Sequence, residues 1–193
     1  MDSFEAHVYP SIGLATSLFI HALNEYHMAV SQREQGKNEL VRHLLATLVY
    51  RTTKIIHDTS ENYPNISIGN NVRTPEKVLA HINSLIQLSN RFWSPDKPVS
   101  MAIRRKESGK NGWDMEVDLF YKMVKEYDDT LVEHPVPRKY SPEKILQGPF
   151  MDAFTHVGQL ALLRRMAGSP IQGESYWMAD VRVGQVGSEQ PLR

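Results

Sequence analysis

The chain has 193 residues, 41% of them apolar, a length and composition that predict one soluble domain over residues 1–193 with a sizeable core. Its 22 basic and 22 acidic side chains cancel, so no net field attracts a polyanion or an anionic membrane, and neither nucleic acid nor membrane is expected as a partner. The absence of cysteine excludes disulfides and thiolate metal ligands, and fits a reducing, cytoplasmic setting.

The first helical pattern lies in residues 12–30. Polar and charged side chains interrupt this stretch, and the residues before it are acidic, so neither a signal peptide nor a membrane span is expected. The polar segment 32–37 predicts a break, which makes residues 1–37 an N-terminal helical extension. The apolar residues recur at helical spacing: Ala15, Leu18, Phe19, Ala22, Leu23, Tyr26 and Val30.

Residues 38–170 are predicted to form the core of an all-α fold. Thr74 before Pro75 is a helix start signal, and Ser141 before Pro142 repeats it. The Gly148–Pro149 pair predicts a kink or a restart. The helices are expected at 38–62, 75–93, 113–133 and 149–167.

Three of these helices have predicted inward stripes. The stripe of the 75–93 helix is His81, Leu85, Leu88 and Phe92. The stripe of the 113–133 helix is Trp113, Val117, Phe120, Val124, Tyr127 and Leu131. The stripe of the last helix is polar at its start and apolar further on: Asp152, His156, Gln159, Leu163 and Met166.

Residues 171–193 are predicted to be an extended C-terminal tail laid over the bundle. Their valines and aromatics stand among glycines and charges, a composition that suits a flap better than a helix. Tyr176 and Trp177 are expected to be partly buried. No segment before residue 174 alternates in the strand period, so no sheet is expected.

A metal site is predicted from His81, Asp152 and His156. Asp152 and His156 are four residues apart, so on a helix their side chains lie on one face about 5–6 Å apart. His81 could supply a third ligand from another helix. Gln159, one turn beyond His156, is placed to orient a ligand, or to serve only as a helix-packing amide.

A purely structural alternative applies to every histidine. Bundles often contain a buried histidine that is satisfied by a hydrogen-bond partner, and Asp152 with His156 could be such a pair. That explanation does not account for a third inward histidine on another helix. The remaining histidines are assigned structural or surface roles: His7, His21, His27, His43, His57 and His134.

The segments 73–82 and 146–165 resemble the DinB (DinB/YfiT-like) superfamily. They read Arg-Thr-Pro-Glu followed by Leu-Ala-His-Ile, and Leu-Gln-Gly-Pro leading into Asp-Ala-Phe-Thr-His-Val-Gly-Gln-Leu-Ala-Leu-Leu-Arg-Arg. The similarity spans roughly residues 38 to 190 and includes Gly-Glu-Ser-Tyr at 173–176. The resemblance implies a four-helix bundle with a crossover connection, commonly dimeric, that holds a divalent metal through His81, Asp152 and His156. The Asp152 position is usually histidine in the family.

Two imidazoles and one carboxylate form a mixed nitrogen and oxygen site that leaves coordination positions open. Zinc or nickel is expected, with iron admitted by the carboxylate. One functional class is a metal-dependent enzyme on a small molecule, either a transferase that uses a low-molecular-weight thiol or a hydrolase that uses water. The other is a non-catalytic metal- or ligand-binding stress protein, favoured if the tail seals the site. DNA binding is disfavoured by the zero net charge.

Overall fold

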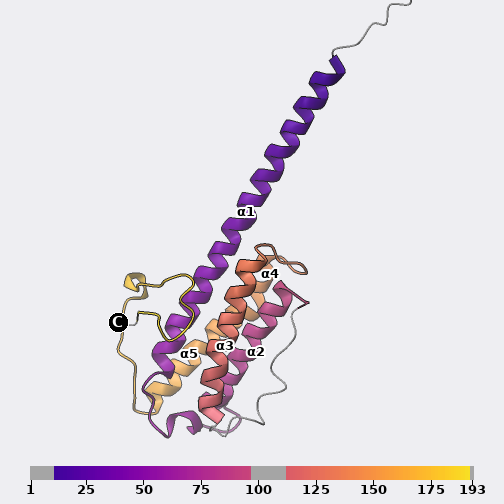
Figure 1. Cartoon of the computed structure of the whole chain (residues 1–193). Helices are drawn as coiled ribbons and strands as arrows, with labels where there is room; N and C mark the ends of the chain where they lie inside the picture. The colour runs from indigo at the N-terminus through magenta and orange to yellow at the C-terminus, as the bar shows by residue number, and fades with distance from the viewer. Residues whose placement is uncertain (1–10, 97–111, 192–193) are drawn as a thin grey trace, which may run out of the picture. The chain divides into compact units, whose positions relative to one another are not determined.

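The computed structural model describes residues 11–96 and 112–191, and the described part is all-α, with no strand (Figure 1). The contacts divide the chain into two units, Met1–Gly36 and Lys37–Arg193. No described helix combines the length and the apolar character needed to cross a membrane. The helical elements, in chain order, are α1 (Ser11–Ile56), η1 (Tyr63–Asn65), α2 (Pro75–Trp93), α3 (Gly112–Glu133), α4 (Pro142–Ile145), η3 (Leu146–Phe150), α5 (Met151–Met166) and η4 (Tyr176–Met178).

The first helix, α1, is continuous, so the predicted break at 32–37 is wrong. That segment consists largely of glutamine, arginine, glutamate and lysine, which are good helix formers. Its one poor helix former, Gly36, costs only about 1 kcal/mol relative to alanine. The predicted end at residue 62 is also wrong, because α1 ends at Ile56 and Asp58 adopts a left-handed conformation with φ of 48°.

The two predicted start signals are confirmed. The Thr74 side chain accepts a hydrogen bond from the Lys77 amide at 3.4 Å, and Pro75 opens α2. Ser141 caps α4 in the same way through the Lys144 amide. These caps satisfy amide groups that have no partner inside the helix.

The predicted kink before the last helix is confirmed at Gly148. Its φ and ψ of −91° and −111° are not helical, and they fall inside the five-residue π-type segment η3. Pro149 follows and has no amide hydrogen to donate, so regular α-helix resumes only with α5 at Met151. The kink therefore determines how α5 is rotated about its own axis, and so which side chains of its first turns face the core.

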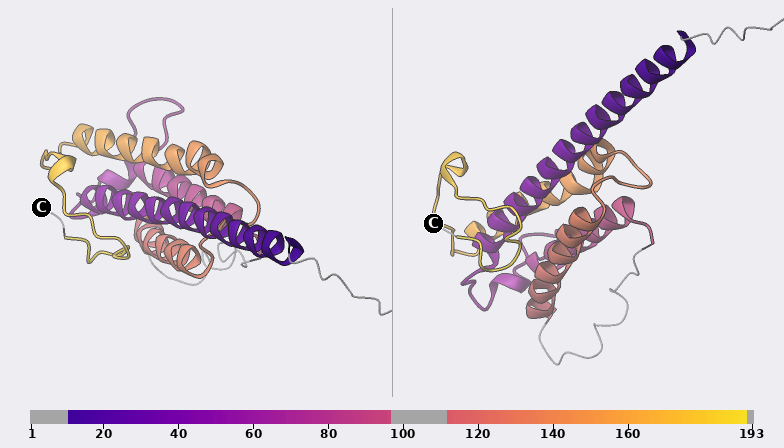
Figure 2. Two further views of the ribbon diagram at one scale, coloured as in Figure 1. Left: turned by 90° about the horizontal axis from the view of Figure 1, so that it is seen from above. Right: turned by 45° about the horizontal axis from the view of Figure 1, so that its top comes forward.

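Helices α2, α3, α5 and the second part of α1 lie side by side around one apolar core (Figure 2). The hydrogen bonds define the directions. Asn38 of α1 donates to the Leu131 carbonyl and Thr53 of α1 accepts from Tyr121 of α3, so these two helices run antiparallel. Two hydrogen bonds show that α2 and α3 run in the same direction: Asn83, midway along α2, donates to Glu116 near the start of α3, and Trp93, at the end of α2, donates to His134 just after α3.

The inward stripe predicted for α3 is confirmed, with Trp113, Phe120, Val124, Tyr127 and Leu131 all buried and Val117 partly buried. The stripe predicted for α2 is wrong in phase. Leu88 is exposed and Phe92 only partly buried, whereas Trp93 is completely buried. The buried face of α2 lies about one residue away from the predicted face, at Val78, Leu79, Ile82, Asn83, Leu85, Ile86, Ser89 and Trp93.

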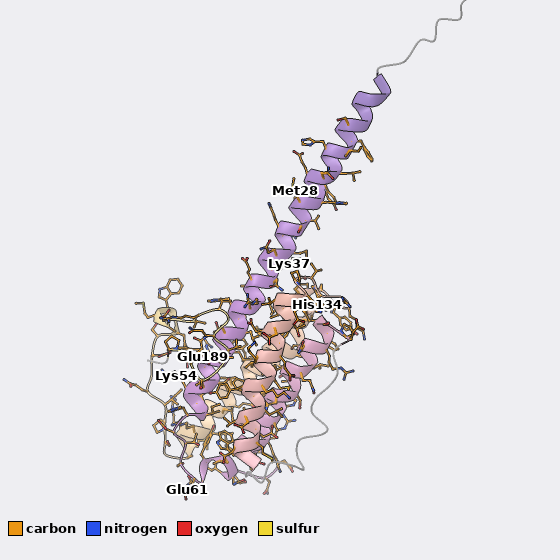
Figure 3. All side chains as sticks on the ribbon, viewed as in Figure 1. Met28, Lys37, Lys54, Glu61, His134 and Glu189 are labelled. Carbon is orange, nitrogen blue, oxygen red and sulfur yellow. The ribbon has the colours of Figure 1, made fainter. Side chains whose placement is uncertain are left out.

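The tail is extended, as predicted, with one short 3₁₀ turn, η4. It runs along α1, as Figure 3 shows around the labelled Lys54 and Glu189. Glu174 binds the Lys54 ammonium at 2.5 Å and accepts from the Tyr50 hydroxyl at 3.1 Å. The expected burial of Trp177 is wrong, since that side chain is 92% exposed, and the apolar anchor of the tail is the buried Val186.

Arg164 joins the end of α5 to the end of α1. Its guanidinium is buried, and it donates only to backbone carbonyl oxygens. Since the last four carbonyls of a helix have no partner within it, Arg164 completes the C-terminus of α1 as well as the turn after α5. The acceptors are the carbonyls of Lys54, Ile55, His57, Asp58 and Ser169, at 3.1, 2.5, 2.6, 3.0 and 2.8 Å.

Replacing Arg164 by methionine should lower the free energy of unfolding by about 2–4 kcal/mol, because one buried and several partly buried carbonyls lose their donor. Urea denaturation followed by circular dichroism measures the change. Arg165→Met is the matched control, since Arg165 is the exposed neighbour, and it should stay within about 0.5 kcal/mol of the parent. Equal losses in the two variants would contradict the capping role.

Candidate metal centre

The candidate site lies between α2 and α5. His81 is in the second turn of α2, Asp152 is in the first turn of α5, and His156 follows one turn later. Helices α2 and α5 pack against each other, which brings the three side chains together. The structure thus assembles all three residues that the sequence selects.

The three side chains converge closely. One ligand atom from each residue can be chosen so that all of them lie within 4.8 Å of one another. The two carboxylate oxygens of Asp152 face different imidazoles: Oδ2 lies 3.9 Å from His81 Nε2, and Oδ1 lies 3.5 Å from His156 Nε2. The two imidazole rings meet edge to face, with centroids 4.5 Å apart. Among the described residues this is the one group of three acidic or histidine side chains that could hold a metal ion.

Gln159 determines which nitrogen of His156 faces the site. The Nδ1 atom of His156 lies 2.7 Å from Gln159 Oε1. An amide oxygen only accepts hydrogen bonds, so Nδ1 carries the hydrogen. In the neutral imidazole, Nε2 then has a free lone pair, which is the form that binds a metal.

This tautomer places the Nε2 lone pair of His156 opposite an oxygen of Asp152. Two lone pairs 3.5 Å apart repel each other unless a cation lies between them or the imidazole takes up a proton. The donor set therefore fits a cation, and the mixture of imidazole nitrogen and carboxylate oxygen is typical of zinc and other divalent transition metals.

The environment of His81 favours its neutral form. Burial lowers its pKa, and the positive charges of protonated His156 and of Arg73 lower it further, while Asp152 acts in the opposite direction. A neutral imidazole is ready to bind a metal without first losing a proton. The sequence assigned no role to Arg73, whose only signal was its place immediately before the Thr74 cap.

The three side chains of the site differ in their exposure to solvent. The His156 side chain is 11% exposed, that of His81 is 32% exposed, and that of Asp152 is 49% exposed. Solvent and small molecules therefore reach the Asp152 side of the site, while His156 is anchored in the packed face of α5.

The inward stripe predicted for α5 is largely wrong. Asp152, Gln159 and Met166 are exposed, and only His156 and Leu163 of that stripe are buried. The site therefore lies at the edge of the core, where α5 meets α2, rather than inside it. The buried face of α5 consists of Ala153, His156, Val157, Leu160, Leu163 and Arg164.

The polar and ring contacts of Glu174 and Tyr176 in the tail lie away from the triad. They go to α1, through Tyr50, Arg51 and Lys54. Tyr176 of the tail lies on the Arg51 guanidinium, 4.1 Å from the ring centroid. The described part of the tail packs along α1, and the Asp152 side chain remains 49% exposed.

The other described histidines lie outside the triad. His21 approaches Glu25 at 3.3 Å on α1, and His57 approaches Asp58 at 2.8 Å after it. Both are pairs of exposed side chains without a third ligand. His27 and His43 are exposed and His134 is partly buried, while His7 lies outside the described residues.

No family model, curated protein or solved structure matches this chain. A function for this chain must therefore follow from the geometry and chemistry of its own residues.

In the metal-free protein, the His81 imidazole should titrate below the 6.5 of an unperturbed histidine. Since the folded pKa is the lower one, the unfolded chain binds more protons near pH 6, and the His81 contribution to stability is lost as the pH falls below about 6.5. NMR titration of the ring protons measures the midpoint. In the His156→Ala variant the midpoint should move upward, because one positive neighbour is gone. A midpoint at or above 6.5 in the parent would contradict this description.

Proposed function

We propose that this chain is a DinB-like four-helix-bundle protein that binds one divalent metal ion through His81, Asp152 and His156. The proposal depends mainly on the position of Asp152, which directs one carboxylate oxygen toward each imidazole. Gln159 adds to this because it holds His156 in the tautomer that binds a metal. The parallel course of α2 and α3 supports the crossover connection that such a bundle requires. Zinc or nickel suits the donor set best, with iron as the further choice.

The distances fit a site that contracts slightly on binding. Two ligands of one tetrahedral zinc ion are about 3.3 Å apart, given bonds of about 2.0 Å. The present pairs, at 3.5 and 3.9 Å, lie within a small side-chain rotation of that value. Asp152 is half exposed and can make this rotation without disturbing the core, whereas His156 stays fixed by Gln159.

We further propose a metal-dependent reaction on a small molecule. Three protein ligands leave at least one coordination position, and the exposure of Asp152 and His81 provides access to it from solvent. A bound divalent ion would supply Lewis-acid activation of a thiol or a water molecule at neutral pH. The residues around it would position the ion, and Gln159 would hold His156 with Nε2 toward it. A non-catalytic binding protein would be favoured by a sealed site, and the open side of this one supports the enzyme.

Elemental analysis of protein purified without a metal-affinity tag should find about one divalent ion per chain. His156→Ala should abolish binding and leave the fold intact, because it removes a ligand at the edge of the core. Gln159→Leu should weaken binding by about 10- to 100-fold, since the ligand loses the group that orients it. His43→Ala is the matched control and should bind as the parent does. A parent that takes up no metal under saturating conditions would refute the site.

The metal-loaded protein should accelerate either transfer of a low-molecular-weight thiol to a panel of electrophiles or hydrolysis of small esters and amides. His156→Ala and metal removal should each abolish that rate, and re-addition of metal should restore it only in the parent. If the loaded protein binds metal stoichiometrically but accelerates neither reaction class, the binding role replaces the enzymatic one.

A further inference from the structure

The part of the first unit that the structure describes is a single helix with an apolar face. Its described residues, 11–36, are all part of α1. Helices in proteins gain most of their stability from packing an amphipathic face against another surface, so this apolar face is suited to a partner. The large apolar side chains exposed on it are Phe19, Ile20, Leu23, Tyr26, Met28 and Val30.

Four of these side chains form one stripe, made of Phe19, Leu23, Tyr26 and Val30. Their spacing of four, three and four residues is the a and d spacing of a coiled coil. All four are substantially exposed, at 66%, 40%, 66% and 43%. The stripe contains no charged residue. A face of this kind is complementary to another helix that carries the same spacing.

The charges near the stripe argue against a lipid surface. Residues 17–36 contain two glutamates and one arginine, a formal charge of −1 with histidines neutral. Amphipathic helices that bind membranes usually carry lysines and arginines on their polar face. On this helix the polar face instead includes the pair of His21 and Glu25 at 3.3 Å.

We propose that the stripe of Phe19, Leu23, Tyr26 and Val30 pairs with the same stripe of a second copy of this chain, and that this two-stranded helical contact makes the protein a homodimer. With the flanking Ile20, each stripe exposes on the order of 500 Å² of apolar surface. Two copies that pair along this face can therefore bury at most roughly 1,000 Å², at the low end of specific interfaces. This contact differs from the side-by-side pairing of bundles, and it does not depend on the metal site.

The test uses the full-length chain and two matched charge substitutions on the same helix. Light scattering over a range of micromolar concentrations should give twice the 22.1 kDa chain mass for the parent. Leu23→Glu should raise the dimer dissociation constant by about a hundredfold or more, because the new carboxylate would be buried without a partner. Met28→Glu changes a side chain that lies away from the stripe and is 58% exposed, and it should remain dimeric.

Thermal unfolding of each variant serves as the folding control, and the second unit should melt as it does in the parent. A monomeric parent would overturn the proposal, and so would a dimer that Leu23→Glu leaves unchanged, since the contact would then lie on another surface. Equal dissociation by the two substitutions would overturn it as well, because the loss would not follow the stripe.

Discussion

The guanidinium of Arg164 connects two helix ends that would otherwise be left with unpaired carbonyls. The bond to the Ile55 carbonyl is buried, and the bonds to the carbonyls of His57 and Asp58 are partly buried, so these acceptors have limited access to water. Because its acceptors belong to the last turn of α1 and the residues after it, the contact fixes the axial position of α5 against α1. Asp152 and His156 are on α5, so the height at which they meet His81 depends on this contact.

The kink at Gly148 supplies the second constraint, because it separates α4 from α5 and sets the rotation of α5. With that rotation, Ala153, Val157 and Leu160 enter the core, and Asp152 remains at its edge. A carboxylate at the edge keeps part of its hydration, which avoids the large desolvation cost of a buried charge. The same position leaves one side of the candidate metal site accessible.

The position of the tail along α1 is fixed by an ion pair and by aromatic contacts. The Lys54 and Glu174 pair is mostly buried and is joined by the Tyr50 hydroxyl, while Tyr176 stacks on Arg51. Partly desolvated pairs of this kind are worth more than exposed ones, because less of their attraction is screened. They hold the tail along α1 and away from the open side of the metal centre. The access on which the proposed reaction depends is therefore a consequence of where the tail docks.

The features that local sequence determined are those that depend on a few neighbouring residues. The caps at Thr74 and Ser141, the kink at Gly148 and the helical spacing of Asp152 and His156 could all be predicted, because each follows from backbone chemistry or from the geometry of one helical turn. The buried stripe of α3 could be predicted as well, because its period is regular and its residues are large and apolar.

The tertiary structure decided the rest, because the remaining features depend on which neighbours a side chain meets. The α2 sequence fits two adjacent faces almost equally, and only packing against α3 and α5 selects the face that buries Trp93 and exposes Leu88. The polar segment 32–37 suggested a break because it has no apolar residue to continue the helical stripe, although its residues are mostly good helix formers. Arg164 gave no sequence signal of burial, since its acceptors are backbone carbonyls far away in the chain. Sequence determined which residues can ligate a metal, and packing of α2 against α5 decided that they meet at an open edge of the core.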